Sequence, residues 1–513
     1  MTGSLWDLIV ARARETPHDT MLVDDAGGSL TFAEYRREVE AAAGALHVDF
    51  GIGPGSVVSW QLPTWIDSFV LVGALARLGA VQNPIIHIYG EREVGFIGEQ
   101  AGSELYVSPK QFGATDFEAR GRGLADANPG LTALAIDRGG LPKGVPSELP
   151  APPTSIDEVR WYFYTSGTTS DPKGARHTDA SIDAVARGMC GCLRMSPDDR
   201  HGLVFPFPHI GGIIWLFGQL QVGFPNFIDQ AFDPATTVDF LHANDVTLAG
   251  AGTYFHQTYL AAQKERDQTL FPSVRGFPGG GAPKPPQLHH AMREAWPGSA
   301  GILSGYGLTE APILTMATPD DPDDKLADTE GRALPGVELK LVGVDGQVCG
   351  PGEEGEVRAK APQMMQGYLD GSLDADAFDD GGWFRTGDLG VLDEDGFLTI
   401  TGRLKDVIIR KGENVSAKRV EDALFGHDAV ADVAVIGLPD EDTGERVCAV
   451  VVTTDGGELT FEQMQQHLEG QQVMKRAWPE QLELVDVLPR NASGKVLKYE
   501  LRERFASAPF SRR

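Results

Sequence analysis

Helical and strand patterns alternate along the first four hundred residues of the chain. Apolar residues recur at helical spacing over 31–46 and 65–78, whereas short apolar runs typical of buried strands occupy 57–62, 104–107 and 159–164. This alternation predicts stacked β-α units with largely parallel sheets.

Two stretches depart from this alternation. Between residues 112 and 159 the periodicity weakens and Pro and Gly become frequent, which predicts an irregular surface excursion. After residue 331 short strands alternate with Gly-rich turns, which predicts a β-rich subdomain.

A new α+β pattern begins near residue 406. Its predicted elements are a strand over 407–410, a helix over 417–424, strands over 430–437 and 446–453, and a helix over 460–468. Because the chain has 513 residues and single cores stop growing at roughly 250–300, we expect more than one packed unit. The predicted fold class is α/β, with a large N-terminal domain over 1–402 that holds the β-α and β-rich subdomains, and a small α+β C-terminal domain over 406–513.

Composition narrows the function classes. The net charge of −29, from 44 Lys and Arg against 73 Asp and Glu, disfavours non-specific attraction to nucleic acid or anionic lipid. Four cysteines make no disulfide framework in so long a chain, so a reducing cytoplasm is the simplest setting. The start lacks the apolar stretch of a signal peptide, and Pro206 and Pro208 break the uncharged run at 202–217, which we interpret as buried core. We therefore expect no nucleic-acid partner and no integral membrane segment.

The strongest chemical signal follows the apolar run at 159–164. Between Thr165 and Gly174 the chain carries five hydroxyl side chains, two glycines and a lysine. Glycines let backbone N–H groups approach an anion, and hydroxyls and an ammonium add donors, so we interpret the stretch as a phosphate cradle. It lacks the GxxxxGK[ST] spacing of a P-loop. The residues expected to bind phosphate are Thr165, Ser166, Gly167, Thr168, Thr169 and Lys173.

Five further motifs follow the cradle in order. They lie at 306–310, 355–368, 386–389, 402–406 and 489–495. Together with the cradle they resemble the superfamily of acyl-CoA and aryl-CoA synthetases, peptide-synthetase adenylation domains and beetle luciferases. Within it the chain looks most like cyclohexanecarboxylate-type and medium-chain acyl-CoA ligases. One departure is Ser170, where the cradle most often has glycine.

The resemblance implies a nucleotide site. The Tyr306 ring can stack on a purine, the Thr309 hydroxyl can bond the α-phosphate, and the Glu310 carboxylate suits Mg²⁺. Asp388 and Arg403 match the ribose-binding pair, because a carboxylate can accept from both ribose hydroxyls. The other residues expected at ATP or AMP are Gly281, Ala282 and Gly307.

The C-terminal motifs carry implied roles in catalysis and domain movement. Lys495 matches a catalytic lysine, since a cation there lowers the repulsion between the attacking carboxylate and the α-phosphate; Lys498 is the competing candidate. Residues 403–405 form the implied hinge, with Lys405 at its pivot, about which a mobile C-terminal domain turns between two half-reactions. Gly412 matches a glycine that lines the tunnel for the pantetheine arm of coenzyme A.

The acyl pocket is expected from the same resemblance. Its proposed lining is His209, Gly212, Gly280 and Ser304. A packed or capping histidine is the competing interpretation of His209. The set is poor in charge, which favours a medium-chain fatty, alicyclic, aromatic or steroid-derived acid. No carboxylate lies in 206–212 to hold an α-amine, so amino acids are disfavoured.

The predicted activity is therefore ATP-dependent acid–thiol ligation, with ATP, Mg²⁺, coenzyme A and a small carboxylic acid as the binding partners. Two alternatives stay open: an adenylating enzyme that loads a carrier protein, and a nucleotide-binding regulator without activity. The sequence also leaves the oligomeric state open, with a homodimer as one option.

Overall fold

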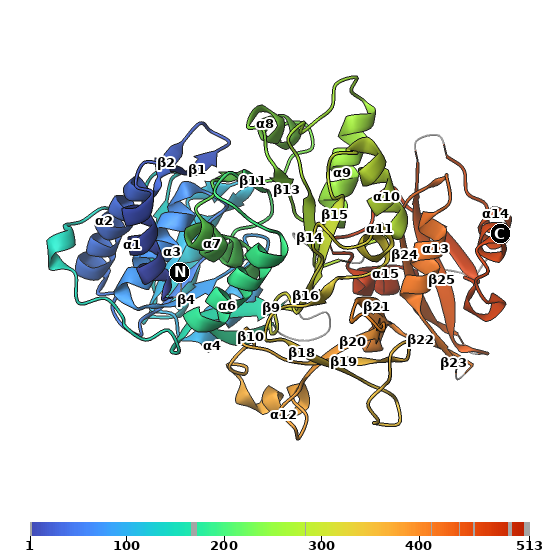
Figure 1. The fold of residues 1–513 in the computed structure, drawn as a ribbon. Coiled ribbons are helices and arrows are strands. Elements are labelled where there is room, and N and C mark those ends of the chain that lie inside the picture. The colour runs from blue at the N-terminus through green and yellow to red at the C-terminus, as the bar shows by residue number, and fades with distance from the viewer. Residues whose placement is uncertain are drawn as a thin grey trace.

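The structure is a computed structural model that describes residues 3–165, 172–282, 284–411, 413–440, 442–454, 457–490 and 495–506. Figure 1 shows the N-terminal helices and sheets on the left, a central region around α9 to α11, and the C-terminal sheet with α13 and α14 on the right. The predicted α/β class, with a large N-terminal and a smaller C-terminal domain, is confirmed.

The first sheet joins strands from three separate stretches of the chain. Its order is β13 (Leu248–Ala249), β11 (His201–Leu203), β12 (Asn226–Ile228), β1 (Thr20–Asp24) and β2 (Ser29–Thr31). All neighbouring strands are parallel except β1 and β2.

The second sheet is also mostly parallel. Its order is β10 (Lys173–Thr178), β9 (Val159–Thr165), β4 (Val81–Pro84), β3 (Val57–Trp60), β5 (Leu105–Pro109) and β8 (Thr132–Ile136). Only β10 runs antiparallel, to β9. The prediction of largely parallel sheets is therefore confirmed for the N-terminal part.

Helices connect and cover these two sheets. They are α1 (Leu5–Glu15), α2 (Phe32–Phe50), α3 (Ile66–Leu78), α4 (Glu91–Ala101), α5 (Phe117–Ala127), α6 (Asp179–Cys192), α7 (Ile210–Val222), α8 (Thr237–Ala243) and α9 (Thr253–Lys264). The N-terminus of α2 is fixed by a reciprocal capping box in which Thr31 accepts from Glu34 N–H and Glu34 accepts from Thr31 N–H. Gly51, at a φ of 69°, ends the helix in the left-handed conformation that glycine adopts without strain.

One hydrophobic core holds side chains of both sheets and of α1, α2, α3, α6 and α7. The uncharged run at 202–217 lies in it as β11 and the first half of α7, which confirms its interpretation as buried core. The predicted irregular stretch at 112–159 is wrong in part, because it contains α5 and β8, and β8 pairs in parallel with β5.

Two small sheets follow the parallel region. The first is β14 (Phe277–Gly280), β15 (Ile302–Tyr306), β16 (Thr315–Met316) and β17 (Arg332–Ala333), with α10 (Pro286–Ala295) and α11 (Asp323–Asp328) beside it. The second is the antiparallel run β18 (Glu338–Val342), β19 (Glu354–Lys360), β20 (Phe384–Leu392) and β21 (Leu398–Arg403). This second sheet is the predicted β-rich subdomain.

The C-terminal sheet has a separate core. Its strands are β23 (Glu413–Val415), β22 (Ile408–Arg410), β25 (Gly444–Thr453), β24 (Val430–Asp440) and β26 (Gln481–Leu484). Its helices are α13 (Ala417–Phe425), α14 (Phe461–Gly470) and α15 (Lys498–Phe505). Two clusters of buried side chains drawn from 408–505 lie on the two sides of β24 and β25.

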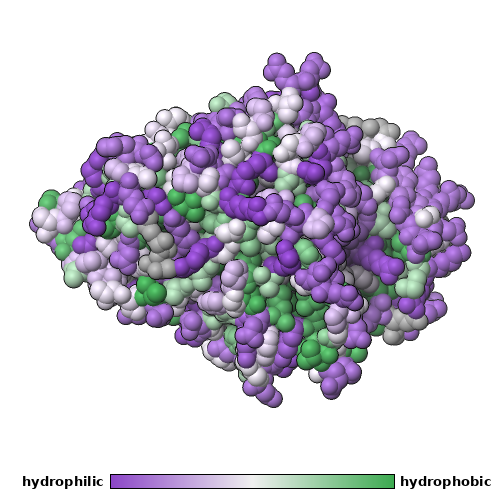
Figure 2. All heavy atoms as spheres, in the orientation of Figure 1, coloured by the Kyte–Doolittle hydropathy of each residue, from purple (hydrophilic) through white to green (hydrophobic). Residues whose placement is uncertain are grey.

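The remaining elements are short. They are β6 (Gln111–Phe112), β7 (Thr115–Asp116), α12 (Asp374–Ala377) and the one-turn 3₁₀ helices η1 (Pro146–Glu148), η2 (Gly371–Leu373), η3 (Leu404–Asp406) and η4 (Lys475–Ala477). No helix among the described residues has the length and apolar character needed to cross a bilayer. Figure 2 shows hydrophilic residues over most of one face of the molecule.

Candidate active site

A cavity of about 760 Å³ is lined both by the small sheets and by the C-terminal region. Among the residues singled out in the sequence, those that line it are Gly281, Ala282, Tyr306, Gly307, Asp388, Arg403, Lys405, Lys495 and Lys498. The competing candidate Lys498 forms an ion pair with Glu421 at 2.7 Å. The fold thus brings together residues from motifs separated by more than two hundred positions.

One wall of this cavity, called the slot below, consists of glycine backbone and an aromatic ring. Gly280, the last residue of β14, is the register partner of Gly305 in β15, and Gly281 and Ala282 follow it. The buried Tyr306 ring lies next along β15, and its hydroxyl donates to Asp388 Oδ2 at 2.8 Å. An aromatic face beside a glycine backbone suits a planar ring.

The glycines in this slot permit close approach of the backbone. A Cβ atom at Gly280 would lie 2.7 Å from the Gly305 carbonyl oxygen. At Gly307 a Cβ atom would lie 2.2 Å from the Ile313 nitrogen. Real Cβ atoms do not approach backbone so closely, so only glycine fits at these two positions without movement of the strands.

Asp388 and Arg403 face each other across β20 and β21. They are register partners, and Arg403 Nε donates to Asp388 Oδ1 at 2.5 Å. Burial lowers the pKa of Arg403, but the neighbouring Asp388 carboxylate outweighs burial, so the pKa is raised overall. The Arg403 guanidinium is therefore charged, and Asp388 also accepts from the Tyr306 hydroxyl.

Lys495 lies in the same cavity, largely removed from solvent. Its pKa is lowered to about 8, mainly by burial and then by the positive charge of Arg403, while Asp388 acts in the opposite direction. The pKa of the neighbouring Lys405 is also lowered, mainly by burial and then by Arg403. The ammonium of Lys495 is thus placed where added negative charge would be stabilised.

Thr309 and Glu310 lie in the turn that follows β15. Tyr368 donates its hydroxyl proton to Glu310 Oε1 at 2.8 Å, and the Lys173 ammonium lies 5.7 Å from the centre of the Tyr368 ring. The Thr309 carbonyl oxygen accepts from Nε2 of the buried His177 at 2.8 Å. The first strand residue of β10, Lys173, is the register partner of Thr165 at the end of β9. These contacts bring the two ends of the predicted cradle near Glu310.

The donor set around Glu310 fits a magnesium ion that is bound mainly through a nucleotide. Among the residues that the structure describes, no group of three or more His, Cys, Asp or Glu could hold a metal. Mg²⁺ commonly takes one or two protein carboxylates and completes its shell with phosphate oxygens and water. A single carboxylate at Glu310 is compatible with that arrangement.

The expected acyl-pocket residues do not line the cavity of about 760 Å³, although Gly280 and Ser304 belong to β14 and β15, the strands beside the slot. None of the four is among the described residues that line it. His209 caps α7, accepting from the Gly211 N–H at 3.1 Å, and burial lowers its pKa to about 4. Gly212 follows it in α7, where a Cβ atom would lie 2.3 Å from the Phe207 carbonyl oxygen. His209 is therefore a capping residue with a neutral imidazole at neutral pH.

Two family models match most of the chain. A family model described as AMP-binding enzyme matches residues 9–369, and one described as AMP-binding enzyme C-terminal domain matches residues 419–495. The chain belongs to the AMP-binding enzyme family. The resemblance to adenylate-forming enzymes inferred from the motifs is thereby confirmed.

Three named proteins are similar to this AMP-binding enzyme over nearly the whole chain. A medium-chain fatty-acid–CoA ligase of Escherichia coli (strain K12) is 30% identical over 98% of this chain and 90% of its own length. A feruloyl-CoA synthase of an Amycolatopsis species is 32% identical, over 97% of this chain and 98% of its own. A salicyl-AMP ligase / salicyl-S-ArCP synthetase of Mycobacterium tuberculosis is 30% identical, over 97% and 90%.

Two solved structures have a similar fold. ATP-bound MatB from Rhodopseudomonas palustris has a TM-score of 0.88 and 27% identity, covering 99% of each chain. The o-succinylbenzoate coenzyme A synthetase of Bacillus subtilis, in complex with ATP and magnesium ion, has a TM-score of 0.83 and 27% identity, covering 96% of this chain and 98% of that one.

Some predicted residues lie outside the part of this AMP-binding enzyme that the structure describes. They are Ser166, Gly167, Thr168, Thr169 and Gly412. Their roles stay predictions that rest on the motif matches.

Sequence reasoning missed two buried charges at the same cavity. Lys284 and Glu330 both line it, at 5% and 9% exposure. Neither lies in a recognised motif, and the only sequence signal was the unusual lysine directly after Gly281-Ala-Pro. Their proximity follows from the packing of α11 against α10 and β15, which local patterns do not encode.

Proposed function

We propose that this AMP-binding enzyme is an ATP-dependent acid–thiol ligase that activates a carboxylic acid as its acyl-adenylate and transfers the acyl group to coenzyme A. The observation that carries the proposal is the common cavity of Lys495, from the C-terminal domain, and the Tyr306, Asp388 and Arg403 group. A cation beside a purine slot and a ribose-binding carboxylate is what acid adenylation needs.

In the first half-reaction the substrate carboxylate attacks the α-phosphorus of ATP. The bond from that phosphorus to the oxygen bridging it to the β-phosphate breaks, so that pyrophosphate leaves and acyl-AMP forms. Lys495 offsets the repulsion between the two anions and stabilises charge on the α-phosphate. Lys173 and the hydroxyls of 165–169 hold the leaving phosphates, and the Thr309 hydroxyl bonds the α-phosphate. Mg²⁺, bound by the phosphates and Glu310, would neutralise the charge on pyrophosphate.

In the second half-reaction the thiol of coenzyme A, after losing its proton, attacks the acyl carbon of acyl-AMP and AMP leaves. We propose that the C-terminal domain turns about Lys405 between the two steps, which withdraws Lys495 and brings the Gly412 segment to the site. The course of the chain supports this pivot, since β21 ends at Arg403 and the C-terminal sheet begins at Ile408, with Lys405 between them.

The acid is proposed to be apolar: a medium-chain fatty, alicyclic, aromatic or steroid-derived carboxylic acid. In α7, where the expected pocket residue Gly212 lies, all residues are uncharged. The relatives named for medium-chain fatty acid and for ferulate act on acids of this kind. The proposed lining is Gly280, His209 at the N-cap of α7, and Gly212 within α7.

A second acceptor is supported by one relative. The name salicyl-S-ArCP synthetase describes acyl transfer to a carrier protein after adenylation. For this chain the same first half-reaction would then be followed by attack of a carrier-bound thiol instead of coenzyme A.

The test is pyrophosphate release with MgATP across fatty, alicyclic, aromatic and steroid acids, with and without coenzyme A. Turnover that requires coenzyme A is expected with one acid class. Acyl-AMP formation that coenzyme A leaves unchanged would favour the carrier protein, and no pyrophosphate release with any acid would contradict the ligase.

A matched pair of lysine variants tests the proposed role of Lys495 in acyl-AMP formation. Lys495→Ala should slow acyl-AMP formation by about 100-fold or more while sparing thioester formation from supplied acyl-AMP. The exposed Lys475→Ala is the control and should leave both rates unchanged. Equal loss of both half-reactions in Lys495→Ala would contradict the division of labour.

A further inference from the structure

The edge of the purine slot carries a buried carboxylate. Side chains of a strand alternate between its two faces, so Ser304 lies on the same face of β15 as Tyr306, two residues later. The Ser304 hydroxyl donates to Glu330 Oε2. The Ser304 hydroxyl therefore binds the Glu330 carboxylate on the face of β15 that also carries Tyr306.

Glu330 is fixed by contacts on its own backbone. Its N–H donates to the Leu398 carbonyl oxygen at 2.7 Å, and its carbonyl oxygen accepts from the Thr315 hydroxyl at 2.6 Å. Its side chain is part of a residue only 9% exposed, yet it lines the cavity together with Tyr306, Gly281 and Ala282. A carboxylate held in this way has little freedom to turn away from a bound ring.

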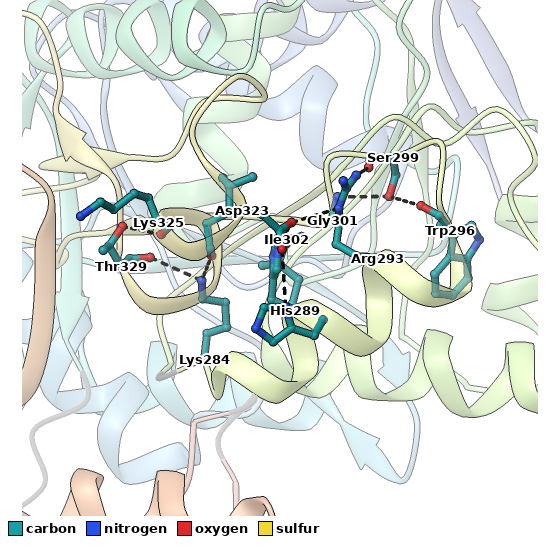
Figure 3. A network of polar contacts seen from close by, with 12 residues as sticks. Lys284, His289, Arg293, Trp296, Ser299, Gly301, Ile302, Asp323, Lys325 and Thr329 are labelled. Atoms are coloured by element: carbon teal, nitrogen blue, oxygen red, sulfur yellow. Dashed lines mark hydrogen bonds and ion pairs between the residues drawn. The ribbon is translucent and has the colours of Figure 1, made fainter.

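The buried ammonium of Lys284 interacts electrostatically with the Glu330 carboxylate. Figure 3 shows Lys284 reaching from the segment before α10 toward Thr329 at the end of α11. Its Nζ donates to the Leu326 carbonyl oxygen and, at 3.4 Å, to that of Thr329. Burial lowers the pKa of Lys284, and the charge of Glu330 raises it in opposition. The Lys284 ammonium is thus held at Thr329, the residue directly before Glu330.

The network in Figure 3 also fixes the strand that carries Ser304. His289 accepts from the Ile302 N–H at its Nδ1 (3.2 Å), and its Nε2 lies 3.3 Å from Asp323 Oδ1 in α11. Burial lowers the pKa of His289 to about 4, so the imidazole is neutral at neutral pH. α10, α11 and the start of β15 are thus tied together behind the slot.

We propose that Glu330 selects adenine, by accepting a hydrogen bond from the 6-amino group of a purine ring stacked on Tyr306. The proposal rests on the proposed function in that it takes ATP as the substrate, and it reassigns Ser304 from the acyl pocket to the purine end of the site. Ser304 is a positioning residue that orients the carboxylate.

The chemistry of the purine edge explains the selection. Adenine presents an amino donor at position 6, whereas guanine and hypoxanthine present a carbonyl oxygen there. A carboxylate only accepts hydrogen bonds, so a 6-oxo group would face it without a proton between them. Leaving a buried charged acceptor unpaired is costly, which makes the site reject 6-oxo purines.

The first experiment needs no variant. Equilibrium binding of ATP, purine riboside triphosphate and ITP to the intact protein is measured without any acid. Purine riboside lacks only the 6-amino group, and we expect it to bind about 10- to 100-fold more weakly than ATP, as for loss of a hydrogen bond to a charged group, with ITP weaker still. Equal affinity for ATP and purine riboside triphosphate would overturn the proposal.

The second experiment separates recognition from a structural role. In Glu330→Ala, ATP should bind about tenfold or more weakly while purine riboside triphosphate binds as in the parent protein. Ser304→Ala should show a smaller change in the same direction, and the exposed Glu338→Gln none. A purely structural Glu330 would weaken both nucleotides equally, which contradicts selection. Because no acid or thiol is present, these results stand apart from the failure of ligase activity.

Discussion

Two opposing effects act on the charge of Lys495: the proposed reaction requires a cation, and burial favours the neutral amine. Adenylation in our proposal needs a cation next to the α-phosphate, yet burial beside Arg403 lowers its pKa to about 8. A lysine is protonated below its pKa and neutral above it, so part of the population loses the required charge just above neutral pH. Its position in the cavity therefore gives a specific pH dependence.

The prediction is that kcat/KM for acyl-AMP formation falls as pH rises through about 8, because that parameter reports ionisations of the free enzyme. Lys495→Arg keeps its charge over this range, so its lower activity should lack that alkaline decline. Pyrophosphate release at pH 6.5 to 10 measures both profiles. An identical decline in the two proteins would assign the ionisation to another group.

Gly280, at the end of β14, gives a second prediction at the residue scale. Gly280→Ala places a methyl group 2.7 Å from the Gly305 carbonyl oxygen, so β14 and β15 must separate. We expect the free energy of unfolding to fall by about 1–3 kcal/mol and ATP affinity to weaken, as for overpacking in a close-packed interior. Gly298→Ala is the control, since nothing lies within 4 Å of its added methyl. Chemical denaturation and ATP binding measure both; unchanged values for Gly280→Ala would refute the tight slot.

At the scale of elements, strong periodicity predicted the structure well. The helices expected over 31–46 and 65–78 are α2 and α3, and the cap at Thr31 fixes where α2 begins. α5 was missed because Gly121 and Gly123 interrupt its helical pattern, and each glycine costs about 1 kcal/mol relative to alanine. Packing of α5 against β5 and β8 overrides that local cost.

Lys284 gives a prediction about how elements are joined. In Lys284→Met the carbonyl oxygens of Leu326 and Thr329 lose a buried donor, and α11 loses its tie to the segment before α10. We expect the free energy of unfolding to fall by about 1–3 kcal/mol, the cost of unsatisfied buried acceptors. The exposed Lys264→Met should change it by less than about 0.5 kcal/mol. Urea denaturation measures both, and equal stability of the two variants would contradict the tie.

At the scale of the whole molecule, motifs predicted which residues meet but not how they contact. Tyr306, Asp388, Arg403 and Lys495 were expected in one site and line one cavity. The Tyr306 hydroxyl bond to Asp388 and the Glu330 carboxylate at the slot were not foreseen, because both depend on strands brought together by the fold. The order of the motifs is enough to infer the family, whereas buried charged residues outside the motifs can be found only in the structure.

Buried imidazoles make the whole fold sensitive to acid. Burial lowers the pKa of His177, His201, His256 and His289 to about 4, from an ordinary value of 6.5. Between these two values the unfolded chain binds protons that the folded chain does not, so the stability that they contribute is lost as pH falls from 6.5 toward 4.

His201 tests this acid sensitivity on one side chain. It is fully buried, stacked on Trp215 with ring centres 3.6 Å apart, and hydrogen-bonded through Nδ1 to Asn226. At pH 5 proton uptake by His201 on unfolding should lower the free energy of unfolding by about 2 kcal/mol. We expect His201→Gln to be less stable than the parent at pH 7. Between pH 7 and pH 5, however, its free energy of unfolding should fall by about 2 kcal/mol less than that of the parent. The exposed His18→Gln should follow the parent. Urea denaturation monitored by tryptophan fluorescence measures the three proteins at both pH values. Because the comparison is a difference between pH values, lost packing in His201→Gln cancels and only the proton remains; equal pH losses in all three would show that His201 is protonated in the fold.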